Sequence, residues 1–313
     1  MSDIEDIMSA ATERLLAAFR PRDRADGCLP FGAPARAEWS YLPGSRRGSE
    51  LAALNPAGRK AAYRLLATAL SRPAFAQAVT IMAFEELLDI EEHEELRRHN
   101  DGYFVAVFGS PGDDAWGWRF EGHHVSVNVT VADGRAVVAP LFLGSNPARV
   151  LDDGDLVAAP LLREETIARD LVTSLPSALR DEAVIAGPAP DDIITAMTAS
   201  TSARLEPAGI TAADLPPEAR GQFARLLHVY LGRLAPELAG SAPHVIDDPA
   251  TAFAWAGGLR PGDPHYYRIQ APGLLVEYDN TQRRGNHAHS VLRRPGDDFG
   301  ASLLPSHLAA ERS

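Results

Sequence analysis

Apolar residues recur every three or four positions in several stretches of the chain, the spacing of one face of an α-helix. In the first stretch, near residues 3–20, polar and acidic residues fill the intervening positions, and Pro21 is expected to end the helix. The same spacing predicts further helices near 52–71, 74–96, 163–180, 187–200 and 216–234.

The period changes from helical to alternating at Tyr103. Residues 103–109 are predicted to form a strand, 116–131 one long strand, and 135–144 a return strand after the turn Ala132-Asp133-Gly134. Alternation returns at Tyr266, with strands over 266–270, 274–280 and 286–293. Strand regions near 103–143 and 266–293 therefore alternate with groups of helices. This order predicts an α+β fold, with helices packed around a mainly antiparallel sheet.

The 313 residues are expected to form a single globular domain, 1–313, in which 1–38 hold an N-terminal helix and an irregular connection. No run of about 18 apolar residues and no secretory signal is visible, so we expect a cytoplasmic protein without membrane association. The formal net charge of −12 argues against a nucleic-acid partner, because phosphate binding relies on clustered Lys and Arg. The lone cysteine, Cys28, excludes a cysteine-based zinc cluster.

The first candidate site residues are the adjacent histidines of Gly122-His123-His124. Successive residues of a strand point to opposite faces, so the two imidazoles would not share a surface. His123 aligns with a valine face, whereas His124 aligns with Trp118 and Phe120 on one side and with polar residues on the other. A face with an aromatic end and a polar end is typical of a ligand pocket, which favours His124. A purely structural role for both histidines is the alternative.

A second group lies on the last predicted hairpin. His287 and His289 are two residues apart on a strand, so both imidazoles face the same way and can bind one metal ion. Glu277 and Asp279 share one face of the preceding strand. If the two strands pair, at least one carboxylate lies on the face of the two histidines. The alternative is a surface hairpin with complementary charges.

These motifs together resemble a widespread bacterial and fungal family classified only as a domain of unknown function. The resemblance extends over nearly the whole chain, from about Trp39 to His307. It is carried by these segments: Trp39-Ser40-Tyr41-Leu42-Pro43, Trp116-Gly117-Trp118-Arg119-Phe120-Glu121-Gly122-His123-His124, Gly144-Ser145-Asn146-Pro147, Tyr266-Tyr267-Arg268-Ile269, Glu277-Tyr278-Asp279, Asn286-His287-Ala288-His289-Ser290 and Asp298-Phe299-Gly300. The resemblance implies that the separated motifs contribute to one composite site, and it implies no reaction.

The favoured hypothesis is a metal-dependent enzyme that acts on a small molecule. His287 and His289 would bind a divalent transition metal (iron, copper or zinc) with His124 or, less favoured, His123 as the third ligand. Glu277 and Asp279 are the candidate acid–base groups, and Glu277 could also be a ligand. Substrate contacts are expected from Trp116, Trp118, Arg119 and Arg268.

Hydrolytic and oxidative chemistry both remain open, as do a metal-free acid–base enzyme and a binding protein without turnover. No phosphate-binding loop or Gly-x-Ser-x-Gly elbow is present, which argues against nucleotide and serine-hydrolase chemistry. Oligomeric state is not predicted.

Overall fold

The computed structural model describes residues 4–93, 99–201, 204–238 and 245–303. Its α-helices correspond to most of the stretches with helical periodicity. They are α1 (Ile4–Ala18), α2 (Pro21–Gly27), α3 (Pro56–Ala69), α4 (Arg72–Glu91), α5 (Leu162–Ser174), α6 (Ser177–Ala183) and α7 (Pro217–Leu231).

One large sheet organises the described part of the chain. Twelve strands join it, in the order β1-β3-β4-β5-β6-β14-β13-β12-β11-β10, with β2 on β3 and β9 on β11. The strands of the sheet are β1 (Cys28–Leu29), β2 (Ser49–Glu50), β3 (Tyr103–Phe108), β4 (Ala115–Gly122), β5 (Val125–Ala132), β6 (Arg135–Ser145), β9 (Val184–Ala186), β10 (Ile210–Thr211), β11 (Ala252–Gly257), β12 (His265–Ala271), β13 (Leu274–Gln282) and β14 (His287–Arg293). β7 (Val150–Asp152) and β8 (Asp155–Ala158) form a separate hairpin. The β1–β3 and β9–β11 pairs are parallel and the other pairs are antiparallel.

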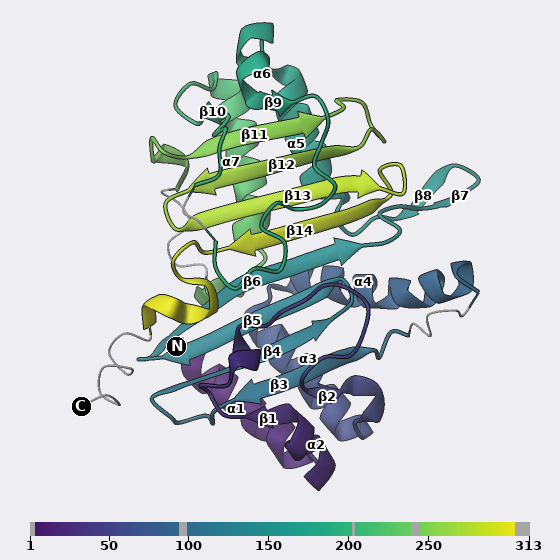
Figure 1. Cartoon of the computed structure of the whole chain (residues 1–313), viewed down its shortest axis with the longest axis vertical. Coiled ribbons are helices and arrows are strands. Elements are labelled where there is room, and N and C mark those ends of the chain that lie inside the picture. Colours follow the sequence, from purple (N-terminus) through teal and green to yellow (C-terminus); the bar gives the residue numbers. More distant parts are fainter. Residues whose placement is uncertain (1–3, 94–98, 202–203, 239–244, 304–313) are drawn as a thin grey trace.

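The two faces of the sheet are covered differently (Figure 1). Helices α1, α3 and α4 lie behind β3–β6, and α5 and α7 lie behind β11–β14, where they form the main apolar core with the strands. Two irregular segments, residues 30–48 and 187–201, cross the opposite face. A smaller apolar cluster fixes them there, in which Tyr41 and Ile193 pack with Phe142 and Val291 of the sheet.

This architecture confirms the α+β prediction and the mainly antiparallel sheet. Several local predictions are wrong. The irregular connection expected after Pro21 begins with helix α2, and the helix expected over 163–180 is divided into α5 and α6. Residues 187–200 form turns rather than a helix, and residues 116–131 form two strands rather than one. The chain reverses at His123-His124, and β4 and β5 pair as an antiparallel hairpin. The single-domain organisation stays a prediction.

The reversal changes which side chains share a face. Phe120 lies opposite Val127 and Trp118 opposite Val129, and cross-strand partners point to the same side of a sheet. Trp118 and Phe120 therefore join the valines in the main core instead of lining a polar face with His124. The valines of this segment all pack in that core.

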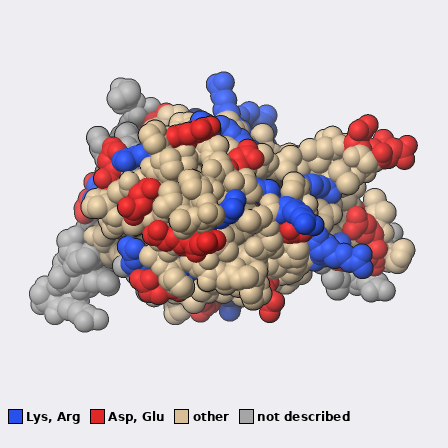
Figure 2. Space-filling view, turned by 90° about the horizontal axis from the view of Figure 1, so that it is seen from above, with Lys and Arg blue, Asp and Glu red and all other residues tan. Residues whose placement is uncertain are grey.

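Acidic and basic side chains are interspersed on the face seen in Figure 2. No helix among the described residues is long and apolar enough to cross a membrane.

Acid should destabilise the protein through His265. Its ring is buried and stacks on Trp255 at a centroid distance of 4.8 Å. Burial lowers the pKa of His265 to about 4, although Glu165 opposes the shift. Below pH 6.5 the unfolded chain binds a proton that the folded chain resists until about pH 4. Between pH 7 and pH 4, the titration of His265 should therefore lower the free energy of unfolding by about 3 kcal/mol.

Urea unfolding at pH 7 and pH 4.5, compared between wild type and His265→Phe, measures this contribution. The phenyl ring keeps the stacking but does not titrate, so the variant should lose less stability in acid. Equal losses in the two proteins would contradict the assignment to His265.

Candidate metal centre

His124 occupies the tight turn between β4 and β5, with a backbone φ of 64°. This left-handed conformation is unusual for a residue with a side chain, so the surrounding structure must stabilise it. The His124 carbonyl accepts a hydrogen bond from the Gly144 N–H at 2.7 Å, and the His124 N–H donates to the Tyr41 carbonyl at 3.3 Å. The turn thereby directs the imidazole toward the start of β14.

His287 and His289 lie on β14, which pairs with β13 as an antiparallel hairpin. Asp279 is directly opposite His289, and a bulge then shifts the register so that Gln282 faces His287. The two imidazole rings are 4.6 Å apart. The predicted hairpin, with both histidines and at least one carboxylate on one face, is confirmed.

The three histidines form one cluster. Nε2 of His124 lies 2.8 Å from Nε2 of His287, and a ligand nitrogen from each of His124, His287 and His289 lies within 4.8 Å of the others. His124 and His289 are 1% and 3% exposed, while His287 is half-buried. Burial and the neighbouring His289 lower the pKa of His287 to about 3, so its imidazole is neutral at physiological pH.

Gly144 provides the room in which two of these rings meet. A Cβ atom at this position would lie 2.7 Å from Cδ2 of His124 and 3.1 Å from Cδ2 of His289. Both distances are shorter than an ordinary carbon contact, so any other residue would push the imidazoles apart.

A carboxylate orients His289. Nδ1 of His289 lies 2.7 Å from Oδ1 of Asp192, and the Tyr41 hydroxyl donates to Oδ2 of the same carboxylate at 3.0 Å. Burial alone would raise the pKa of Asp192, but its bonds to His289, Ile193 and Tyr41 hold it below the ordinary value. Nε2 of His289 is buried and has no hydrogen-bond partner. The ring therefore keeps one nitrogen available to a ligand.

Asp279 lies beside His289 and Asp192. It forms a group with Asp192 and His289 whose ligand atoms lie within 4.8 Å of one another. Its Oδ1 accepts a hydrogen bond from the Thr281 hydroxyl at 3.0 Å, whereas its buried Oδ2 has no partner. Burial raises the pKa of Asp279 to about 8, against the effect of Thr281.

His123 points toward the helical layer. Its Nδ1 lies 2.5 Å from Oε1 of Glu85 on α4, and its ring is 3.6 Å from that of His124. Glu85, His123 and His124 also form a group of closely spaced ligand atoms. His123 therefore supports the His124 side of the cluster, and His124 is the histidine that meets the pair on β14.

Glu277 is held away from the cluster by four donors. It accepts hydrogen bonds from the Ile194 N–H (2.6 Å), the Thr195 N–H (3.1 Å), the Thr195 hydroxyl and the Tyr266 hydroxyl (2.9 Å). These contacts fix the segment that carries Asp192. A loop-anchoring role thus explains the burial of this carboxylate.

The four residues predicted to contact substrate pack in the core or donate to backbone carbonyls. Trp116 and Trp118 are buried in the core on the helical side. The Arg119 guanidinium donates to the carbonyls of Ala35 and Glu38, and that of Arg268 donates to those of Leu205 and Pro207. Both arginines therefore tie irregular segments to the sheet.

Three residues that contact the histidine cluster, Glu85, Asp192 and Tyr41, were not predicted from the sequence. Glu85 lies inside an ordinary helical pattern, and Asp192 lies in a segment that was predicted to be helical. Tyr41 belongs to one of the motifs that carry the family resemblance, which was the only signal for it.

The chain belongs to a family of proteins of unknown function, DUF3500, whose model matches residues 2–301. Membership agrees with the resemblance noted in the sequence and extends it to the N-terminal helix. No curated protein and no solved structure matches the chain.

Replacing Glu277 with Gln should lower the unfolding free energy by about 2–4 kcal/mol, because an amide nitrogen would face N–H and O–H donors in a buried site. Thermal and urea unfolding measure the loss. The exposed Glu182 on α6 is a matched control, and Glu182→Gln should change the stability by less than about 0.5 kcal/mol. A Glu277→Gln protein as stable as wild type would contradict the anchoring role.

Proposed function

We propose that this protein is a metal-dependent enzyme acting on a small molecule, with His124, His287 and His289 as the ligands of a divalent transition metal. The observation that carries the proposal is the convergence of one ring nitrogen from each of these three histidines within 4.8 Å, together with a buried Nε2 of His289 that has no hydrogen-bond partner. Buried polar atoms are nearly always satisfied, so an orphaned imidazole nitrogen beside two others suggests a missing ligand.

The donor set suits iron, copper or zinc. Neutral imidazoles bind these ions, whereas calcium and magnesium prefer oxygen ligands. The nitrogens of a tetrahedral site with bonds of 2.0–2.1 Å lie about 3.3 Å apart. Nε2 of His124 and of His287, at 2.8 Å, need to separate by only about half an ångström. The carboxylate of Asp192 on the far nitrogen of His289 resembles the outer-shell partner that fixes the orientation of many metal-binding histidines.

Three protein ligands leave a coordination position for water or substrate. Zinc would lower the pKa of bound water to about 7 and support hydrolysis. Iron or copper would support oxidative chemistry. In either case Asp279, with one unpartnered buried oxygen beside His289, is the side chain best placed to exchange protons with the substrate. Substrate would enter past half-buried His287 and past Asp192, whose side chain is 32% exposed.

A metal-free acid–base enzyme is the second candidate, and the Asp192–His289 hydrogen bond favours it. A carboxylate that orients a histidine is the usual arrangement for a general base. The same residues serve both candidates, so metal content distinguishes them.

Elemental analysis of protein purified without a histidine tag is the first test. We expect one equivalent of iron, copper or zinc for each chain. Apoprotein that binds none of iron, copper, zinc and manganese at micromolar concentration would overturn the metal proposal in favour of metal-free chemistry. A substrate screen of the loaded protein then tests turnover.

Replacing a metal ligand should weaken metal binding more than replacing a residue that only orients a ligand. His287→Ala and His289→Ala should abolish tight binding, whereas Asp192→Asn should weaken it about 10–100-fold. The exposed His228 on α7 is a control, and His228→Ala should bind metal like wild type. The fold should survive all four changes, because a core of this size does not depend on an ion. Competition with a chromophoric chelator gives the affinities, and circular dichroism reports the fold.

Gly144→Ala tests the geometry without removing a ligand. The added methyl group contacts the rings of His124 and His289, so metal affinity should fall by roughly tenfold or more, since ligands must be held to within about 0.5 Å. Gly221 on α7 is half-buried with open space around its Cβ position, and Gly221→Ala is the matched control. Unchanged affinity in Gly144→Ala would mean that these rings do not share an ion.

A further inference from the structure

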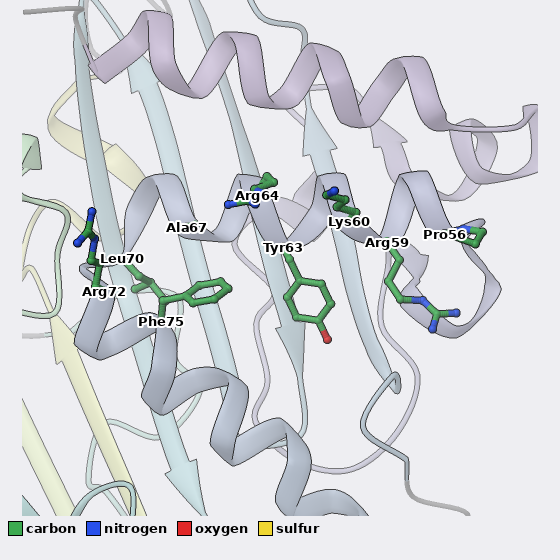
Figure 3. Close-up of a pocket in the computed structure, with 9 residues that line it drawn as sticks. All are labelled: Pro56, Arg59, Lys60, Tyr63, Arg64, Ala67, Leu70, Arg72 and Phe75. Carbon is green, nitrogen blue, oxygen red and sulfur yellow. The ribbon is translucent and has the colours of Figure 1, made fainter.

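A pocket of about 820 Å³ lies along α3 and the start of α4, and none of its lining residues belongs to the histidine cluster (Figure 3). Its volume is within the range of small-molecule sites, roughly 300–1,000 Å³. The lining residues recur every three or four positions along α3, so they form one stripe of that helix. The opposite stripe, which includes Leu65 and Leu66, is buried in the core.

The middle of the pocket is apolar and aromatic. Tyr63 and Phe75 project from α3 and α4 into the same space and are half-buried, with buried Leu70 beside them. The Tyr63 ring also contacts Phe120 of the sheet at a centroid distance of 6.2 Å, which fixes its position. Two rings at the surface of a pocket favour a flat hydrophobic partner.

The charge of the pocket is opposite to that of the chain. Four of its nine lining residues are Arg or Lys and none is acidic, although the formal net charge of the chain is −12. Arg59 forms an ion pair with Asp101 at 2.7 Å. The exposed side chains of Lys60, Arg64 and Arg72 have no carboxylate within ion-pair distance among the described residues. Three cations therefore remain available around an aromatic surface.

We propose that this pocket binds a small aromatic carboxylate, with the ring system between Tyr63 and Phe75 and the carboxylate among Lys60, Arg64 and Arg72. An arginine fork matches the two oxygens of a carboxylate, and the apolar surface holds the rings. The site is separate from the metal centre and does not depend on the function proposed there.

Calorimetric titration with 2-naphthoate and with its neutral analogue 2-naphthamide tests the proposal. Naphthoate is expected to bind, naphthamide to bind at least about tenfold more weakly, and added salt to reduce the difference. An exposed charge pair changes an equilibrium by up to about fivefold, so a Lys60→Gln, Arg64→Gln, Arg72→Gln triple variant should weaken naphthoate by roughly tenfold or more. Phe75→Ser should weaken both compounds.

The exposed Arg225 on α7 is the matched control, and Arg225→Gln should bind naphthoate like wild type. His287→Ala should also do so, which separates this test from that of the metal centre. Equal binding of the two compounds, no binding of naphthoate at millimolar concentration, or no effect of the triple variant would overturn the proposal. Co-sedimentation with phosphatidylserine vesicles without naphthoate binding would likewise overturn it and identify the cations as a lipid-binding surface.

Discussion

The hydrogen bonds that Glu277 accepts from residues 194 and 195 are the constraint on which the candidate site depends. A carboxylate buried in a sheet costs free energy unless donors surround it, and here the donors come from an irregular segment. That segment covers the sheet and brings Asp192 to His289. Glu121 does the same for the other irregular segment, because it accepts the Ser40 N–H at 3.0 Å and so fixes the neighbourhood of Tyr41. Hydrogen bonds to two buried carboxyl groups, rather than regular secondary structure, thus position these segments.

Burial determines the protonation of His287 in the cluster. Water normally stabilises the charged form of an imidazole, and its exclusion leaves His287 neutral with a lone pair available. The same exclusion raises the pKa of Asp279, whereas Asp192 stays ionised because His289 and Tyr41 donate to it. One small volume therefore contains a neutral imidazole, that of His287, beside carboxyl groups of different basicity. Catalytic and metal-binding sites commonly share this feature.

The two sides of the sheet differ in polarity. Its helical side is filled by large apolar residues, while its other side carries polar residues that need partners from the covering segments. The histidine cluster lies at one end of the central strands, where the β4–β5 turn, β6 and β14 meet. Gly144 at this junction shows how closely the backbone of one strand must approach two imidazoles that belong to others.

The sequence by itself determined the fold class and the pairing of β13 with β14. Alternation at a period of two also placed His287 and His289 on one face, because the pleat of a strand allows no other arrangement. The same rule misplaced Trp118 and Phe120. Only the tertiary structure decided that the chain reverses at His123-His124, since contacts with Tyr41 and Gly144 stabilise that turn. Asp192 and Glu85 reach the histidines across 97 and 38 residues of sequence. No local pattern encodes contacts of that kind, because they arise from how the segments pack on the sheet.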